Sequence, residues 1–305
     1  MTLATPPTAV DKFSTEYESF VVENSSSPDW LKAVRQQAWS TFSELGLPTK
    51  RRGTELWKYT NLQPLADADF AYGVTGSVSL DQMKVVGPWD DAFDTVVVVD
   101  GEFSVELSNL HGSTGLDAGS LAEAIAAGTG SVESQLASLA GREKYAFTAL
   151  STAFVDDGAY VRIADGTQLE QPVHVVFVTS DAAENRASYP RLLVDAGAGS
   201  SVVLIETYVN LAESAQFAAP VVEMFAGDGS SVRHYRVQME NESSFHFGTT
   251  RVAQMGNTDF TSTSFAVGAS IARNDIHTLL DAPGANCTLH GLYMTNGEQQ
   301  QDQEI

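Results

Sequence analysis

The chain has 305 residues, of which 39 are acidic and 17 basic, so its net charge is −22. This excess of negative charge repels nucleic acid phosphates and anionic lipids, which makes both unfavourable partners. A single cysteine excludes an internal disulfide framework. The first ten residues carry no basic run ahead of an apolar core, and no apolar segment approaches the about 20 residues that a membrane helix needs. We therefore expect a soluble cytoplasmic protein that binds neither nucleic acid nor membranes.

The N-terminal part of the chain is predicted to be mostly helical. A helix over residues 28–45 is indicated by Ser27 as the N-cap, Pro28 at the first helical position and Gly46 just past the end. Its apolar stripe consists of Leu31, Val34, Ala38, Phe42 and Leu45. A shorter helix is expected near residues 10–22.

A basic block follows this helix. It gathers Lys50, Arg51, Arg52 and Lys58 into nine positions of a strongly acidic chain. Such clustering is consistent with a contact to an anion or to a partner protein. The same side chains can instead neutralise neighbouring carboxylates while their aliphatic stems are buried. The second interpretation is favoured, and the first stays open.

A mixed connector precedes the main repeat. Asp100-Gly101 is a strong hairpin signal between two apolar runs. The expected hairpin strands are residues 96–99 and 103–107. Ser120 and Glu123 form a capping box that predicts a helix running towards residue 127, and residues 132–139 suggest another short helical turn.

From residue 149 onward, a pattern of strand, glycine turn and strand returns five times. The turn glycines, 28 to 31 residues apart, are Gly166, Gly197, Gly227, Gly256 and Gly284. The apolar runs before them are residues 161–164, 192–194, 221–225, 251–253 and 278–280. The runs after them are rich in β-branched and aromatic residues and are 173–178, 202–208, 232–237, 260–267 and 287–293. So constant a period indicates a solenoid.

Helical arrays such as ankyrin repeats also have periods near 30 residues, but they need a 3.6-residue apolar period. These segments alternate with period two, which favours strands. A strand, a glycine corner, a second strand and a polar return loop make one coil of a parallel β-helix, and stacked coils pair their strands. The expected return loops are residues 180–189, 210–216, 239–244 and 269–275.

The predicted fold is therefore mainly β, with a parallel β-helix after a helical start. Its three parts are a mostly helical region (1–90), a mixed α/β connector (91–148) and the β-helix core (149–305). The chain stops one polar return after the last predicted strand, and an open last coil would expose unpaired backbone groups. We therefore expect that residue 305 is not the natural end of the functional protein.

Glycine-rich segments at 197–199 and 227–229 look superficially like nucleotide loops. Each opens a strand rather than a helix and lacks the third glycine of a dinucleotide-binding fingerprint, so a coil corner explains it better. The sequence also contains no Walker A loop, no Gly-x-Ser-x-Gly elbow and no His-Glu-x-x-His motif. Nothing in it predicts an ATPase, a hydrolase elbow or a zincin.

Cys287 and His290 are the best candidates for soft-metal ligands. A spacing of three on a strand puts them on opposite faces, so they cannot hold one metal ion without a bulge. His234 takes a register similar to that of His290 but lies two coils away, about 10 Å. Structural roles are favoured for all three residues.

Arg273, Asp275 and His277 can share one strand face as a polar cluster that orders a return loop. The histidines without sequence companions are His111, His174 and His246, and we expect them to be ordinary polar residues. The sequence therefore predicts no catalytic, cofactor-binding or metal-ligating residue.

Several separated motifs resemble those of the SufB/SufD proteins of iron–sulfur cluster assembly. The entry to the core is similar at residues 149–154, 157–158 and 161–174. Later core motifs are similar at residues 273–275, 289–293 and 299–302. Residues 52–60 resemble the N-terminal signature of the family, and their position favours the SufD branch over SufB. The resemblance covers about residues 40–305.

The resemblance implies a right-handed parallel β-helix that acts as a scaffold, not as an enzyme. It implies a SufB-like paralogue and a SufC-like ABC ATPase as partners, and an iron–sulfur cluster that the complex assembles, with no cofactor in this chain. The SufC-docking helices and the histidine implicated in cluster work lie in a C-terminal portion of the family that has no match here. Cys287 does not match the cluster cysteine, which belongs to SufB.

Two other readings remain open. A β-helix polysaccharide lyase or hydrolase would usually be exported and would gather carboxylates on one sheet, whereas the acidic residues of this array fall mainly in corners and returns. A purely structural solenoid is the third reading.

Overall fold

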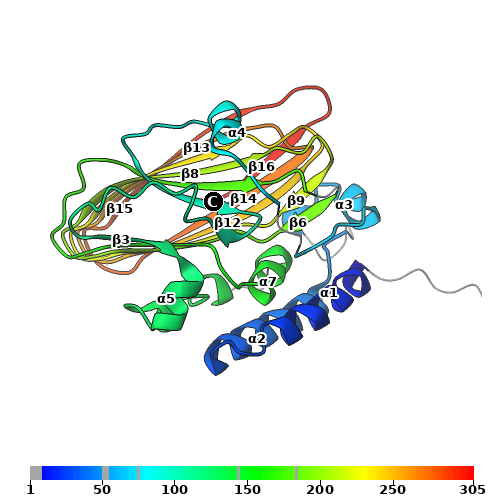
Figure 1. Ribbon diagram of the computed structural model, residues 1–305, viewed down its shortest axis with the longest axis horizontal. Coiled ribbons are helices and arrows are strands. Elements are labelled where there is room, and N and C mark those ends of the chain that lie inside the picture. Colours follow the sequence, from blue (N-terminus) through cyan, green and yellow to red (C-terminus); the bar gives the residue numbers. More distant parts are fainter. Residues whose placement is uncertain (1–8, 50–54, 74–75, 143–144, 183–184) are drawn as a thin grey trace, which may run out of the picture.

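The computed structural model describes residues 9–49, 55–73, 76–142, 145–182 and 185–305 (Figure 1). Its helices are α1 (Ala9–Glu23), α2 (Asp29–Leu45), η1 (Glu55–Trp57), α3 (Gln63–Asp67), α4 (Leu80–Val86), α5 (Leu121–Ala127), α6 (Val132–Gln135), η2 (Ala140–Arg142) and α7 (Ala146–Ala153). Its strands up to the first complete coil are β1 (Asp94–Val99), β2 (Glu102–Phe103), β3 (Leu116–Ser120), β4 (Ala159–Ile163), β5 (Val173–Thr179), β6 (Arg186–Ser188) and β7 (Arg191–Ala196). The later strands are β8 (Ser201–Asn210), β9 (Gln216–Ala218), β10 (Val221–Ala226), β11 (Ser231–Gln238), β12 (Phe245–Gln254), β13 (Asp259–Val267), β14 (Ile271–Leu280), β15 (Asn286–Met294) and β16 (Gln300–Glu304).

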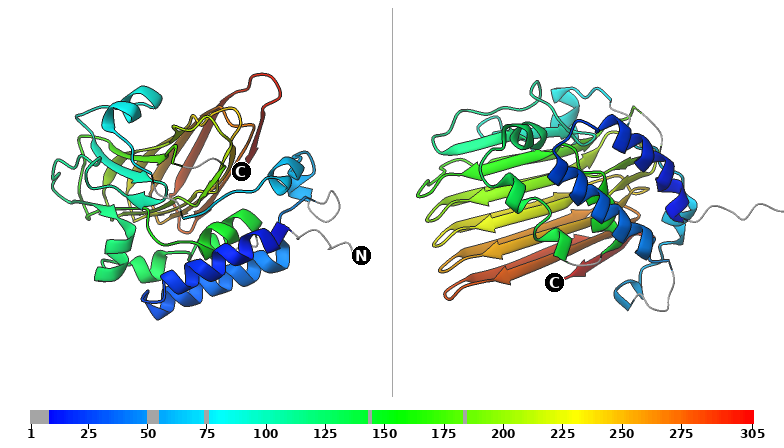
Figure 2. Two further views of the ribbon diagram at one scale, coloured as in Figure 1. Left: turned by 45° about the vertical axis from the view of Figure 1, so that its right-hand side comes forward. Right: turned by 90° about the horizontal axis from the view of Figure 1, so that it is seen from below.

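Two stacked sheets form a solenoid of about five turns over residues 159–304. Their strand orders are β15-β13-β11-β8-β5-β1-β2 and β16-β14-β12-β10-β7-β4-β3. Successive coils add one parallel strand to each sheet, and Figure 2 shows the strands stacked from green to red. The register is continuous, since Val232 lies between Val202 and Phe260 in the neighbouring coils. The predicted parallel β-solenoid is confirmed.

Each predicted apolar run of the repeat lies wholly or largely within a strand, but three boundaries were wrong. One is the predicted return loop 180–189, which contains strand β6. The β array begins at Ala159 rather than at residue 149, because α7 is a helix whose eight residues are all buried. Residues 271–275 belong to β14 and are not part of a return loop. Their polar side chains misled the prediction, since Arg273 and Asp275 are buried and Arg273 contacts the N-terminal part of the chain.

The coil corners use their glycines in two different ways. Positive φ angles occur at Gly166, Gly199, Gly229, Asn257 and Gly284. Gly197, Gly227 and Gly256, which the sequence marked as the turn residues, are not among them. They are required by close stacking instead, because a Cβ atom on Gly197 would lie 2.5 Å from Oδ1 of Asp165 in the coil before.

Helices α1, α2 and α7 cover the outer face of the nine-stranded sheet (Figures 1 and 2). An aromatic cluster joins them to the strands, with Phe147 of α7 stacked on Phe247 of β12 at 4.1 Å between ring centroids. Gly46 ends α2 as predicted, with its N–H donating to the carbonyl of Phe42. The predicted N-cap was wrong: Pro28 occupies that position, and the hydroxyl of Ser27 accepts a hydrogen bond from Arg35.

The predicted hairpin is only partly present. Asp100 and Gly101 form its turn with positive φ angles, as expected, but the second strand is β2 alone, and residues 104–107 are not a strand. Strand β1 also pairs in parallel with β5, so it is the first strand of the seven-stranded sheet. The hydroxyl of Ser120 accepts from the N–H of Glu123 and caps α5, as predicted.

Candidate functional site

The structure separates the two residues proposed as soft-metal ligands. Cys287 faces the lumen of the solenoid, half-buried, with Sγ 3.6 Å from Oγ1 of Thr278. His290 is exposed on the opposite face of the same strand, as the spacing predicted. His234 aligns with Ser262 and then with Leu289, not with His290, so the expected common register was off by one residue.

The lumen changes character along each strand. Near the corners it is apolar, with Val202, Val232 and Phe260 stacked in one column. The same alternation turns polar side chains inward further along: Glu206, four residues beyond Val202 on β8, and His234 and Arg236, two and four residues beyond Val232 on β11. We call the resulting group the lumen cluster: Glu206, His234, Arg236, Glu240 and His246.

A continuous chain of contacts runs through the lumen cluster. Nε2 of His234 and Nε of Arg236 each lie 3.4 Å from Oε1 of Glu206. Nη2 of Arg236 contacts Nε2 of His246, whose Nδ1 lies 2.8 Å from Oε2 of Glu240. Because a guanidinium only donates hydrogen bonds, Nε2 of His246 must accept and its Nδ1–H must donate. The geometry therefore fixes one tautomer of a neutral imidazole.

The pKa is shifted for two members of the lumen cluster, His246 and Glu240. Burial lowers the pKa of His246, an effect that Glu240 opposes and Arg236 reinforces. For Glu240, burial alone would raise the pKa, but hydrogen bonds and charges from His246, Gln238 and Arg236 lower it overall. Glu206, Arg236 and Glu240 are all buried in the lumen. Removing one member of such a buried group leaves the remaining polar side chains without a partner, which is destabilising.

The lumen cluster is not arranged as a metal site. Across the part of the chain that the structure describes, no three His, Cys, Asp or Glu side chains converge as ligands. The Arg236 guanidinium also sits against Glu206, where it competes with any cation for that carboxylate. The sequence prediction that no residue ligates metal stays a prediction.

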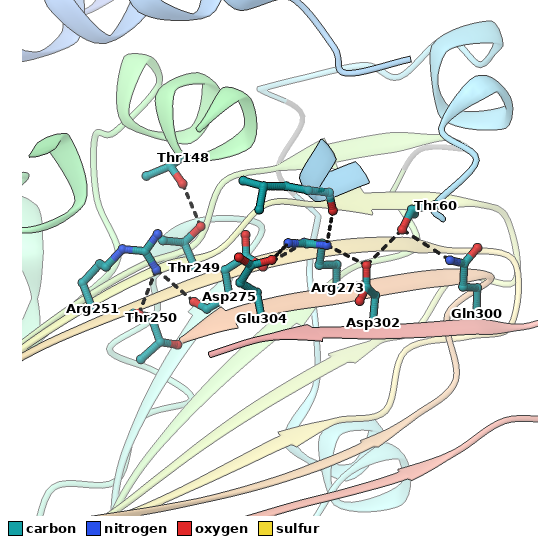
Figure 3. A network of polar contacts seen from close by, with 11 residues as sticks. Thr60, Thr148, Thr249, Thr250, Arg251, Arg273, Asp275, Gln300, Asp302 and Glu304 are labelled. Carbon is teal, nitrogen blue, oxygen red and sulfur yellow. Dashed lines mark hydrogen bonds and ion pairs between the residues drawn. The ribbon is translucent and has the colours of Figure 1, made fainter. Parts of the chain in front are cut away.

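A second polar group lies on the outer face of the nine-stranded sheet (Figure 3). We call it the outer-face network: Arg251, Arg273, Asp275, Asp302 and Glu304. Nε of Arg273 lies 2.8 Å from Oδ1 of Asp275, its Nη1 lies 2.6 Å from Oδ2 of Asp302, and its Nη2 contacts Glu304. One guanidinium therefore joins β14 to β16.

The outer-face network also contacts the N-terminal part of the chain. Nη1 of Arg273 donates to the carbonyl of Leu56 at 2.8 Å. Burial alone would lower the pKa of Arg273, but Asp275, Asp302 and Glu304 raise it overall. Burial raises the pKa of Asp275, against the effect of Arg273. Arg273 and Asp275 of the predicted polar cluster contact each other on one face of β14, although they order no return loop. The third predicted member, His277, packs edge-to-face against the ring of Tyr145.

Sequence reasoning missed most of the lumen cluster. Glu206 lies one coil before Arg236 and Glu240, so the three form no local motif, and His246 was taken for a histidine without companions. The usable signal was a charged residue at an inward position of an alternating strand, as at Glu206. His174 is buried on the outer face of the other sheet, where burial lowers its pKa to about 4.

Most of the predicted basic block lies outside the described residues. This applies to Lys50, Arg51 and Arg52. Lys58 is exposed, and its ammonium group lies 5.2 Å from the centroid of the Tyr59 ring. The choice between local neutralisation and partner contact therefore stays a prediction. Among the described helices, none is long and apolar enough to cross a membrane.

Comparison with known proteins gives matches along nearly the whole chain. Residues 11–175 match the SufBD protein N-terminal region, and residues 177–305 match the SufBD core domain of the SUF system for FeS cluster assembly. The iron–sulfur cluster assembly SufBD family protein of Synechocystis sp. is 27% identical over 308 residues, which cover 97% of this chain and 66% of the relative. The chain thus spans about two thirds of that relative's length. On the two consecutive family matches, which coincide with a helical start and a β-solenoid, the chain belongs to the SufB/SufD family of iron–sulfur cluster assembly proteins.

Proposed function

We propose that this chain is a SufD-like, non-catalytic scaffold subunit of a cytoplasmic complex that assembles iron–sulfur clusters. Its partners would be a SufB-like paralogue and a SufC-like ABC ATPase, and the cluster would be the product of the complex rather than a resident cofactor. The observation that carries the proposal is the succession of the two family regions over residues 11–305. The chain would bind neither nucleic acid nor a membrane.

The SufD-like assignment draws on two further observations. The signature at residues 52–60 has the position expected for the SufD branch. Cys287 faces the lumen beside Thr278 and does not converge with His290 on a metal-binding geometry. A subunit that shapes the complex without holding the nascent cluster fits both observations. The three-part division at residues 90 and 148 stays part of this proposal.

Co-expression with SufB-like and SufC-like proteins from the same source tests the function. The expected result is one complex that contains all three chains, whose ATP hydrolysis requires the SufC-like subunit. The chain alone should hydrolyse no ATP and carry no stoichiometric metal by elemental analysis. Turnover of a polyuronide by the chain alone, or about one iron per isolated chain, would contradict the proposal.

A further inference from the structure

A short segment of the N-terminal region contacts strand β16. We call residues 56–60 the strap. They are more than 200 positions away in sequence from the strand they contact, since the hydroxyl of Thr60 donates to Oδ2 of Asp302 at 3.0 Å. Nε2 of Gln300 donates to the carbonyl of Tyr59 at 3.0 Å and also reaches the Thr60 hydroxyl at 3.3 Å. Figure 3 shows the contacts of Thr60 with Asp302 and Gln300 beside Arg273.

Trp57 anchors the strap on the sheet. Its ring lies 4.4 Å from the guanidinium carbon of Arg273 and 5.2 and 5.7 Å from the rings of Phe147 and Phe247. A cation over an indole face in a partly desolvated site is among the stronger contacts of this kind. The strap thus covers the side of Arg273 that its carboxylate partners do not occupy.

Strand β16 carries no apolar side chain that could pack against neighbouring residues of the sheet. Its five residues are Gln300, Gln301, Asp302, Gln303 and Glu304. The outward-facing pair, Asp302 and Glu304, both bind Arg273. Among the described residues, β16 pairs its backbone with β14, and its side chains are held by Arg273 and the strap.

Arg273 thus contacts both the strap and β16, two segments that lie far apart in the sequence. Removing the strap would leave the guanidinium without the carbonyl of Leu56 and expose it to water, which weakens its pairing with Asp302. Removing β16 would leave two carboxylate positions around Arg273 empty and take away the acceptor of Thr60. Groups that share one buried charge in this way stabilise one another non-additively.

We propose that the strap is a latch on β16: docking of Trp57 and Thr60 and ordering of Gln300–Glu304 form one coupled transition, with Arg273 as the common partner. Any event that lifts the strap therefore loosens β16. By linkage the coupling is reciprocal, so that disabling β16 must also loosen the strap.

Hydrogen exchange of the full chain, followed by mass spectrometry, tests the latch. Trp57→Ala should raise the exchange rates of amides in residues 300–304 about tenfold or more, with those of β10 unchanged. Tyr59→Ala is the matched control, because its side chain is 83% exposed and its contact to Gln300 uses only the backbone. Unchanged protection of residues 300–304 in a folded Trp57→Ala protein would overturn the proposal.

A second experiment tests the coupling in the other direction, from β16 to the strap. Asp302→Ala should speed exchange at residues 56–61, and the double variant Trp57→Ala/Asp302→Ala should lose less protection than the sum of the single changes. Should Trp57→Ala fail to fold, Thr60→Val removes one hydroxyl and should still raise exchange at residues 300–304 about threefold. Additive effects of the two changes in the double variant would show that the contacts are independent. Unchanged exchange at residues 56–61 in Asp302→Ala would show the same and contradict the latch.

Discussion

Nδ1 of His246 lies 2.8 Å from Oε2 of Glu240 in the lumen, while its other ring nitrogen accepts from Arg236. Burial and the contact with Arg236 lower the pKa of His246 and favour the neutral imidazole, against the effect of Glu240. A proton added at Nε2 would face a guanidinium that cannot accept it. Lowering the pH should thus destabilise the folded solenoid, because protonation of this buried histidine is unfavourable.

The first prediction is a loss of stability between pH 6.5 and about pH 4. The pKa of His246 is lowered in the folded chain, and that of His174 is lowered to about 4. A lowered histidine pKa means that the unfolded chain binds more protons, so stability is complete above pH 6.5 and falls as the pH drops. His174 alone should cost about 2 kcal/mol at pH 5.

Denaturant unfolding at pH 7 and pH 5 measures this loss. The variant His174→Gln/His246→Gln should lose much less stability over this range than the wild type, because glutamine can donate and accept without titrating. His290→Gln, at an exposed histidine, is the control and should behave as the wild type. Equal pH dependence in the double variant and the wild type would show that these histidines do not carry the effect.

The second prediction concerns a buried ion pair. Glu223 contacts Arg191 and accepts from the N–H groups of Ala137, Leu139 and Ala140 at 2.7 to 2.9 Å. Glu223→Ala leaves a buried guanidinium and three N–H groups without this acceptor, which should cost about 3–5 kcal/mol.

Thermal and urea unfolding check the cost of Glu223→Ala. The control is Glu213→Ala, at an exposed residue, which should change the free energy of unfolding by less than about 0.5 kcal/mol. Similar stability in the two variants would mean that water or a neighbouring group replaces the carboxylate of Glu223.

The third prediction is that Cys287→Ser leaves folding nearly intact. The thiol is half-buried in the lumen and makes only a long contact to Thr278, so it behaves as a small apolar group. The expected change is at most about 1 kcal/mol in unfolding free energy. If the variant melted normally yet abolished cluster assembly by the three-subunit complex, Cys287 would act as a ligand.

The solenoid could be predicted from the sequence because its signals are local and repeated. Strand alternation and corner glycines recur in each coil, so one coil supports the interpretation of the next. The lumen cluster could not be predicted, because Glu206, Arg236 and His246 meet only after three coils have stacked. The outer-face network could not be predicted for the same reason, since Arg273 is 217 positions away from the Leu56 carbonyl that it binds. Polar residues at 271–275 looked like a loop since the segment that buries them lies far away in sequence.

The corner glycines show a similar limit of sequence-based prediction at single residues. The sequence places Gly197 and Gly199 in one turn but does not say which of them needs a positive φ. The structure gives that angle to Gly199, at +64°, and leaves its Cβ position open, with no described atom within 4 Å. At Gly197 the backbone angle is ordinary, and the space is occupied by the coil before.

The last prediction separates these two roles. Gly199→Asn should cost less than about 1 kcal/mol, because asparagine tolerates a left-handed conformation and Asn257 already adopts one, with φ of 56°, at the equivalent corner. Gly197→Ala should cost about 2–3 kcal/mol. Its Cβ would lie 2.7 Å from the backbone nitrogen of Asp165 and 2.8 Å from the carbonyl of Ile163, so stacked coils would have to move apart. Urea unfolding of both variants gives the comparison, and a Gly197→Ala protein as stable as Gly199→Asn would show that the corners stack less tightly than the structure requires.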